Sequence, residues 1–219
     1  MKLLLTSAGW WKNPEIGQEF IRLVNKKPPE IRILLVMTPT KHVKDNKYAI
    51  RMLRQFKSVG IPKENVVFYR FDKNISDNDL KNIDVIFVFG GNTFEYLDGL
   101  RKSGLDKKIV SFIKKGGVYV GLSAGSYVVC PTIEAASWKH ADKNRVGLKN
   151  LRGLNLVPFL ITAHFNDEVH KVVSRSAIRS KRPTIALTDK QAVLVRDESA
   201  FIIGGGETTI FNFTKGFKL

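Results

Sequence analysis

One serine stands where the sequence could build a nucleophile. Residues 116–129 read GGVYVGLSAGSYVV, an apolar strand that gives way to small residues, and Ser123 lies midway between Gly121 and Gly125. A serine hydroxyl is a poor nucleophile at neutral pH and needs a base beside it. A sharp strand-to-helix turn exposes such a side chain, and the two glycines let strand and helix converge without a clash. G-x-S-x-G also occurs by chance, so the surrounding sequence must decide whether Ser123 is catalytic.

The base should be a histidine, and the chain has four: His42, His140, His164 and His170. Only His164 ends an apolar strand, FLITAHF, whereas the others fall at a helix start, in a polar loop or within a helix. Active sites in parallel sheets lie at the carboxyl ends of the strands. We therefore predict that His164 lies at the same sheet edge as Ser123.

An acid should orient the imidazole and stabilise its charged form. The interval between the serine and the histidine carries Glu134 and Asp142, and either could serve. The order serine, acid, histidine is that of α/β-hydrolases. The interval of 41 residues from serine to histidine is short for that fold, which argues for a different family.

The oxyanion of a tetrahedral intermediate needs backbone N–H donors. The N–H of Ala124, next after the serine, points into the predicted site. The second donor must come from a neighbouring strand end, and FGGNT is the other glycine-rich candidate. We predict that Gly91 supplies it.

Short apolar segments alternate with amphipathic ones along the chain. The strands and helices that they form must position the serine, the histidine, the acid and the backbone donors. Strands are predicted at 2–8, 31–39, 65–71, 84–91 and 117–123, and helices at 13–26, 42–60, 76–83 and 93–116, the last broken near residue 104. Such alternation predicts an α/β fold with a mostly parallel sheet and helices on both faces. After a strand at 153–165 and a helix at 167–181, four short segments predict an antiparallel meander on one edge of that sheet.

The composition limits which classes of protein the chain can belong to. The 219 residues are 43% hydrophobic, which suits a single domain over 1–219. The one cysteine, Cys130, excludes an internal disulfide and fits a reducing cytoplasm. No apolar run reaches the length of a signal-peptide core or a membrane span.

The net charge of +16 comes from scattered basic residues rather than from long runs. Nucleic-acid-binding signatures are absent, so we expect a solvated basic surface with no specific nucleic-acid partner and no membrane partner.

Three segments in order resemble the aspartyl dipeptidase (dipeptidase E) and cyanophycinase family of serine peptidases: GGNTFEYLDGLRKSGL, GVYVGLSAGSYVVCPTIE and FLITAHFND. The resemblance implies a class I glutamine amidotransferase-like, flavodoxin-like fold in which serine replaces the amidotransferase cysteine. It implies that Ser123 is the nucleophile and His164 the base, with Gly91 and Ala124 as oxyanion donors. It implies no cofactor and no metal.

The chain departs from the family pattern at the acid. Where aspartyl dipeptidases have an aspartate five residues after PTI, this chain has Trp138. We rank Asp142 above Glu134 as the acid. A further dipeptidase acid matches Asp189, for which the resemblance leaves two roles, the acid or recognition of the substrate amine; we group it with the substrate-binding residues.

The resemblance also implies a substrate. The family's preferred dipeptides begin with aspartate, and an arginine on the helix after the histidine is expected to bind that carboxylate; here Arg175 fits best, with Trp138 reshaping the pocket. The predicted function is hydrolysis of short peptides by a cytoplasmic serine peptidase, as a monomer or a homodimer. The alternative is a non-peptidase member of the fold that acts as a binding protein.

Overall fold

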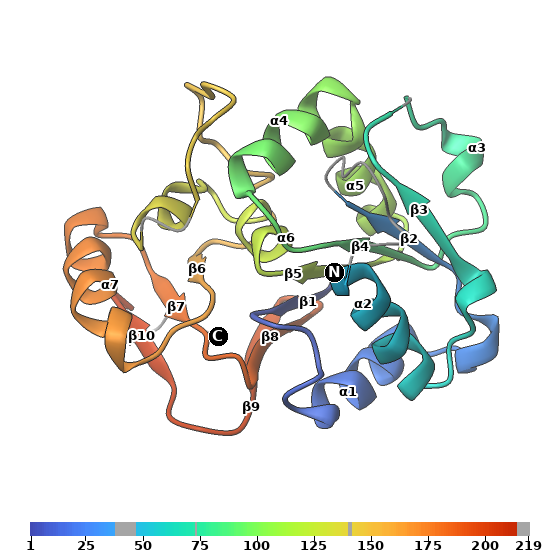
Figure 1. Ribbon diagram of the computed structural model, residues 1–219, viewed down its shortest axis with the longest axis horizontal. Helices are drawn as coiled ribbons and strands as arrows, with labels where there is room; N and C mark the ends of the chain where they lie inside the picture. Colours follow the sequence, from blue (N-terminus) through green and yellow to red (C-terminus); the bar gives the residue numbers. More distant parts are fainter. Residues whose placement is uncertain (38–46, 73, 140–141, 214–219) are drawn as a thin grey trace.

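A twisted seven-stranded sheet runs through the middle of the molecule, with a smaller three-stranded sheet beside it (Figure 1). The computed structural model describes residues 1–37, 47–72, 74–139 and 142–213. Strand order in the large sheet is β3-β2-β4-β5-β1-β8-β9, and in the small sheet β10-β7-β6. The strands are β1 (Lys2–Thr6), β2 (Ile33–Val36), β3 (Val66–Tyr69), β4 (Val85–Val88), β5 (Val118–Leu122), β6 (Leu160–Thr162), β7 (Thr184–Ala186), β8 (Gln191–Arg196), β9 (Ser199–Gly204) and β10 (Thr209–Phe211).

Helices cover both faces of the large sheet. Figure 1 shows α1 and α2 on one face and α4, α5 and α6 on the other. The α-helices are α1 (Pro14–Val24), α2 (Lys47–Ser58), α3 (Asp77–Leu80), α4 (Thr93–Lys102), α5 (Leu105–Lys114), α6 (Ala124–Tyr127) and α7 (Asp167–Ser180); the 3₁₀ turns are η1 (Pro28–Glu30), η2 (Lys63–Asn65) and η3 (Glu134–Ser137). The predicted fold class is therefore confirmed, and the first five residues of the helix predicted at 42–60 lie outside the described residues.

Local sequence signals explain where the helices begin and end. The Asn13 side chain accepts a hydrogen bond from the Glu15 N–H at 3.1 Å, and Pro14 opens α1 with a φ already suited to a helix. Gly104, with φ of 69°, separates α4 from α5, a backbone conformation that glycine adopts at little cost. Both expectations from the sequence are confirmed.

The core is continuous across the large sheet because its central strands are buried on both faces. Every residue of β2 and β4 is buried, as are the three leucines of β1. Parallel strands covered by helices on both sides read as uninterrupted apolar runs. This burial fixes the register of β4, β5 and β1, which lie next to one another.

The C-terminal strands differ from the predicted meander. β8 and β9 do extend the large sheet, antiparallel to β1 and to each other. The segments of β7 and β10 instead join β6 in the small sheet, where β6 and β7 are parallel. The reason is α7, which connects β6 to β7 as a crossover and so makes them parallel neighbours rather than a hairpin.

Candidate active site

Ser123 lies in a strained turn between β5 and α6. Its φ of 49° and ψ of −106° are uncommon for a residue with a side chain. The Ser123 N–H donates to the Thr6 carbonyl at 2.9 Å, and the Ser123 carbonyl accepts from the Ser126 N–H at 2.7 Å. Backbone strain of this kind costs about 1–3 kcal/mol and persists only where the surroundings enforce it. These bonds hold the side chain at the carboxyl edge of the sheet.

The two glycines of the motif are required by close packing of α6 against the sheet. A Cβ on Gly121 would lie 2.6 Å from the carbonyl carbon of Gly125. A Cβ on Gly125 would lie 2.1 Å from the carbonyl oxygen of Val88, at the end of β4. Neither contact is sterically allowed, so the expected reason for the G-x-S-x-G spacing is confirmed.

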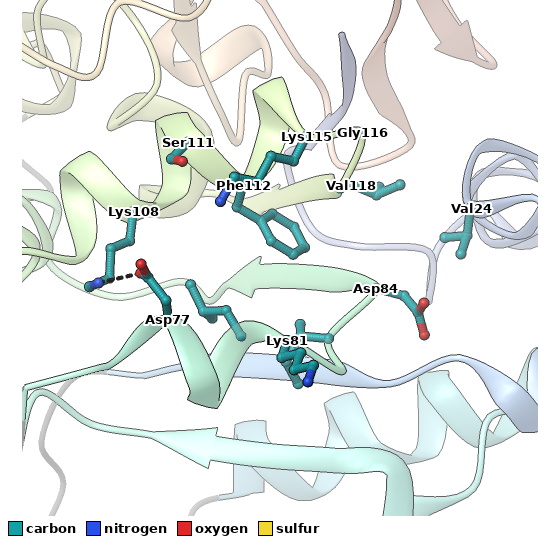
Figure 2. A pocket seen from close by; sticks show the side chains of 13 residues that line it. Val24, Asp77, Lys81, Asp84, Lys108, Ser111, Phe112, Lys115, Gly116 and Val118 are labelled. Carbon is teal, nitrogen blue, oxygen red and sulfur yellow. Dashed lines mark hydrogen bonds and ion pairs between the residues drawn. The ribbon is translucent and has the colours of Figure 1, made fainter.

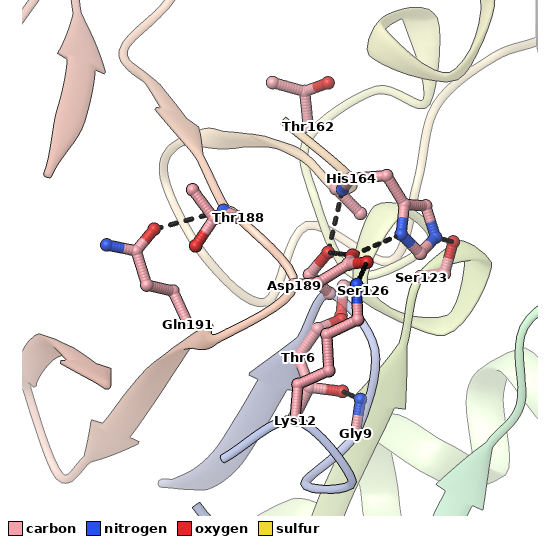
Figure 3. A network of polar contacts seen from close by, with 12 residues as sticks. Thr6, Gly9, Lys12, Ser123, Ser126, Thr162, His164, Thr188, Asp189 and Gln191 are labelled. Atoms are coloured by element: carbon pink, nitrogen blue, oxygen red, sulfur yellow. Dashed lines mark hydrogen bonds and ion pairs between the residues drawn. The ribbon is translucent and has the colours of Figure 1, made fainter. Parts of the chain in front are cut away.

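His164 lies between Ser123 and Asp189 (Figure 3). Its Nε2 is 3.0 Å from Ser123 Oγ, and its Nδ1 is 2.6 Å from Asp189 Oδ1. His164 follows β6, has a positive φ of 55°, and has its backbone N–H bonded to Ser7 Oγ at 2.7 Å. The imidazole is thus held from both its ring nitrogens and its backbone.

Asp189 is held by a network that the sequence did not reveal. Lys12 Nζ lies 2.6 Å from Asp189 Oδ2 (Figure 3). Ser7 Oγ donates to Asp189 Oδ1 at 3.0 Å. The hydrogen bond from His164, followed by those from Lys12 and Ser7, holds the pKa of the Asp189 carboxyl well below its usual range, against an opposing effect of partial burial. The carboxylate therefore stays ionised beside the imidazole at neutral pH.

Two backbone N–H groups adjoin the serine. Gly91 follows β4 with φ of 155°, and Ala124 is the first residue of α6. Within the described ranges neither N–H donates to a protein acceptor. Both are therefore available to a bound group.

A cavity of about 510 Å³ opens onto Ser123 and His164. It is lined by residues that follow β1, β2 and β4, by Tyr48 and Arg51 from α2, and by Asp189. Its volume lies within the range of roughly 300–1,000 Å³ typical of small-molecule sites.

Comparison with known proteins places the chain in a family. The model of peptidase family S51 matches residues 3–203. The chain belongs to peptidase family S51. An uncharacterized peptidase of Listeria innocua is 32% identical over 133 residues, covering 59% of this chain and 64% of that protein. Peptidase E of Escherichia coli is 31% identical over 147 residues, covering 63% of this chain and 62% of its own length. The chain thus matches less than two thirds of the length of these relatives.

Solved structures share the S51 chain's fold. A peptidase E protein of Listeria monocytogenes superposes with a TM-score of 0.76 at 22% identity, covering 94% of this chain and 98% of its own. A peptidase from an acI-B1 actinobacterium gives a TM-score of 0.63 at 16% identity, covering 96% and 93%.

The contact predicted between Asp142 and His164 is wrong. Asp142 Oδ2 accepts from Thr93 N at 2.8 Å and from Thr93 Oγ1 at 2.5 Å, so it caps the start of α4. An ionised carboxylate is stabilised there by the free N–H groups and the dipole of the helix. The imidazole Nδ1 is occupied by Asp189 instead.

Glu134 also lies away from the imidazole. Its Oε1 accepts a hydrogen bond from Ser180 Oγ at 2.5 Å and lies 3.7 Å from Arg182 Nε. These contacts join η3 to the end of α7, which is a structural use of the carboxylate.

The residues predicted to bind substrate are dispersed. Arg175 is exposed on α7 and does not line the cavity. Trp138 packs between the large core and a small cluster around Phe165 and Val173. Asp189 does line the cavity, but its oxygens contact protein groups.

Cys130 is buried, and burial raises the pKa of its thiol to about 12. A thiol in that state is not a nucleophile at neutral pH. It lies beyond the end of α6, which is at Tyr127.

Ser7 and Lys12 contact Asp189 but were not predicted from the sequence. Ser7 is a fully buried polar residue directly after the apolar β1, at the edge where the site was expected. That position was a usable signal. Lys12 had none, because one lysine among 36 basic residues does not stand out.

A second hollow, of about 370 Å³, lies at the opposite edge of the sheet (Figure 2). Its two carboxylates are paired: Lys108 Nζ is 2.5 Å from Asp77 Oδ1, and Asp84 Oδ2 is 3.1 Å from the ammonium of Lys26. Lys81 and Lys115, which also line the hollow, have no ion pair among the described residues. The described residues that line it include no histidine to activate Ser111. This hollow therefore lacks the chemistry of the Ser123 cavity.

The described residues contain no cluster of three side chains that could ligate a metal ion. No helix there has both the length and the apolarity to cross a membrane.

Proposed function

We propose that this chain is a serine peptidase that hydrolyses short peptides with Ser123 as nucleophile, His164 as general base and Asp189 as the orienting acid. One observation carries the proposal: the line of contacts from Ser123 Oγ to His164 Nε2 at 3.0 Å and from His164 Nδ1 to Asp189 Oδ1 at 2.6 Å. Nucleophile, base and orienting acid in hydrogen-bond reach of one another are the signature of activated serine.

Acylation follows from this geometry. Ser123 Oγ attacks the carbonyl carbon of the scissile peptide bond while His164 Nε2 takes the hydroxyl proton. The carbonyl oxygen becomes an oxyanion, which the N–H groups of Gly91 and Ala124 stabilise by hydrogen bonds. The C–N bond then breaks, and the proton on Nε2 passes to the leaving amine. An acyl ester on Ser123 remains.

Deacylation uses the same groups in a second cycle. His164 Nε2 takes a proton from water, whose oxygen attacks the ester carbon, and the proton returns to Ser123 Oγ as the ester bond breaks. The free acid leaves, and the hydroxyl is restored.

Asp189 determines which ring nitrogen of His164 carries the proton. It accepts from Nδ1–H, so Nε2 carries the lone pair that faces Ser123. Its ionised carboxylate also stabilises the imidazolium that forms in each step. Its contacts to Ser7 and Lys12 hold it in place.

The size of the cavity and the peptidase E relatives support short peptides as substrates. Selection of an N-terminal aspartate by Arg175 lacks that support, because Arg175 is exposed outside the cavity. A cytoplasmic location fits the free Cys130 and is proposed with the function.

A panel of Asp-Leu, Ala-Leu and Lys-Leu tests the proposal. The wild type should release free leucine from at least one dipeptide, and Ser123→Ala should lose this activity by several orders of magnitude. Binding without any hydrolysis by the wild type would instead favour a non-peptidase binding protein.

A further inference from the structure

Arg51 lines the Ser123 cavity and has no acidic partner in the part of the chain that the structure describes. It lies on α2 with an exposed side chain. Across the described ranges no carboxylate pairs with it; its guanidinium carbon lies 3.7 Å from the ring centre of Trp11. A guanidinium stacked on an indole is held by cation–π attraction and still directs its N–H donors outward.

The position of this pair is fixed by the fold. Gln55, one helical turn beyond Arg51, accepts from the Trp10 N–H at 2.8 Å through Oε1 and from Trp10 Nε1 at 3.0 Å through its carbonyl. The Trp10 indole stacks on Phe20 with ring centres 5.1 Å apart. The loop after β1, which carries Trp11, is therefore tied to the same face of α2 that carries Arg51.

Among the described residues that line the cavity, the one charge without an oppositely charged partner is that of Arg51, and it is positive. The acidic residue among those that line it is Asp189, whose oxygens already contact His164, Ser7 and Lys12. A short peptide at neutral pH carries both an ammonium and a carboxylate. The described lining residues include no free carboxylate for the ammonium, but they include a guanidinium for the carboxylate.

We infer that Arg51, stacked on Trp11, is a carboxylate-binding subsite for the substrate of Ser123. The guanidinium fork matches a carboxylate with two parallel N–H···O bonds. The group it binds is either the C-terminal carboxylate of a short peptide or the side chain of an acidic residue. The inference rests on the proposed function and names the substrate class of that site.

Three peptides separate the two sources: Ala-Leu has only a C-terminal carboxylate, Asp-Leu-amide only a side-chain carboxylate, and Ala-Leu-amide neither. Their dissociation constants are measured by calorimetry on Ser123→Ala protein, which does not consume them. Adding Arg51→Met should weaken binding of a carboxylate peptide by about 10- to 100-fold, the effect of one charge-assisted hydrogen-bonded pair. Binding of Ala-Leu-amide should be unchanged.

Arg54→Met is the matched control. Arg54 lies three residues along the same helix, is exposed, and does not line this cavity, so its loss removes the same charge without the contact. It should leave all three dissociation constants within about twofold. Arg51→Lys should restore part of the affinity, because it keeps the charge but loses the planar fork.

A loss confined to Ala-Leu assigns the subsite to the terminal carboxylate, and a loss confined to Asp-Leu-amide assigns it to the side chain. The inference is overturned if Arg51→Met leaves both carboxylate peptides unaffected, weakens the amide equally, or matches Arg54→Met. It is also overturned if none of the peptides binds. If the binding difference holds but the wild type hydrolyses nothing, the peptidase proposal fails and the subsite stands.

Discussion

At the scale of single residues, the imidazole of His164 has a hydroxyl at one ring nitrogen and a carboxylate at the other. The two carboxylates ranked highest from the sequence have other partners: Asp142 contacts Thr93, and Glu134 contacts Ser180. What distinguishes Asp189 is its hydrogen bond with His164, followed by those with Lys12 and Ser7, which together make its ionised form favourable.

Asp189→Asn should reduce kcat by about 10⁴, because the amide favours the wrong imidazole tautomer and removes the charge opposite the imidazolium. Asp142→Asn is the matched control, since it makes the same chemical change at the start of α4. It should cost about 1–3 kcal/mol of unfolding free energy and leave kcat nearly intact. An inactive Asp142→Asn beside an active Asp189→Asn would contradict the assignment.

Lys12 should set the pH at which activity is lost. The depressed pKa keeps Asp189 ionised as pH falls, so only the base gains a proton, and log kcat/KM should fall with a slope of one at acidic pH. In Lys12→Met the Asp189 carboxyl loses a hydrogen bond that lowers its pKa, so Asp189 should take up a proton, and activity should be lost, at a higher pH than in the wild type.

Lys12→Arg keeps the charge and should keep the wild-type pH profile. A Lys12→Met profile identical to that of the wild type would mean that the ammonium does not influence the titration of Asp189. A slope of two would mean that a second group, such as Asp189, titrates in the same range.

Ser123 and His164 could be proposed from the sequence because each directly follows an apolar strand, which is a local signal. The role of Asp189 could not be settled in the same way. It depends on which strand lies next to β1 and in which direction that strand runs. Two possible roles for one aspartate were therefore left open.

At the scale of elements, the antiparallel pairing of β8 with β1 determines where Asp189 lies. β8 runs opposite to β1, with Ala192 paired to Thr6, so the residues before β8 lie at the carboxyl edge of β1. The turn that holds Asp189 therefore lies beside Ser7. In a wholly parallel sheet the start of the same strand would lie at the far edge.

The turn at Ser123 depends on backbone contact between α6 and the neighbouring strands. Gly125→Ala should place a Cβ against the Val88 carbonyl, displace α6, and lower both activity and the melting temperature. Overpacking of about 1–3 kcal/mol corresponds to a decrease of about 2–10 °C.

Gly205→Ala is the control, because a Cβ there meets no atom within 4 Å and the residue has no positive φ. Its melting temperature should match the wild type within about 2 °C. Equal melting temperatures for Gly125→Ala and the wild type would show that α6 can move away from β4 without cost.

The main sheet and its helices could be predicted because their signals are local in the sequence. An apolar run predicts a buried strand, and a capping residue such as Asn13 predicts the start of a helix. The division of the C-terminal strands between two sheets was not. The sequences of β7 and β10 favour a strand just as those of β8 and β9 do, so they do not show which sheet each strand joins. The pairing of these strands follows from tertiary packing around α7.

At the scale of the whole molecule, the chain has a net charge of +16. Among the described residues that line the Ser123 cavity, the charge without an opposite partner, that of Arg51, is also positive. Such a field raises the local concentration of anionic solutes and is screened by salt. A single domain over residues 1–219 stays a prediction from their composition.

Salt should therefore affect substrates according to their charge. Raising the ionic strength should lower kcat/KM for Asp-Leu several-fold, change it little for the zwitterionic Ala-Leu, and not lower it for Lys-Leu. Steady-state kinetics in sodium chloride provide the measurement. The same decrease for all three dipeptides would point to a salt effect on the enzyme rather than on encounter.

The covalent chemistry of Ser123 is the central claim, and labelling with a fluorophosphonate tests it most directly. Intact-mass and peptide mapping should find one adduct per chain, on Ser123, with a rate that falls by orders of magnitude in His164→Ala and in Asp189→Asn but not in Asp142→Asn. An adduct on another residue, or a labelling rate unaffected by loss of His164, would contradict the Ser123–His164–Asp189 site.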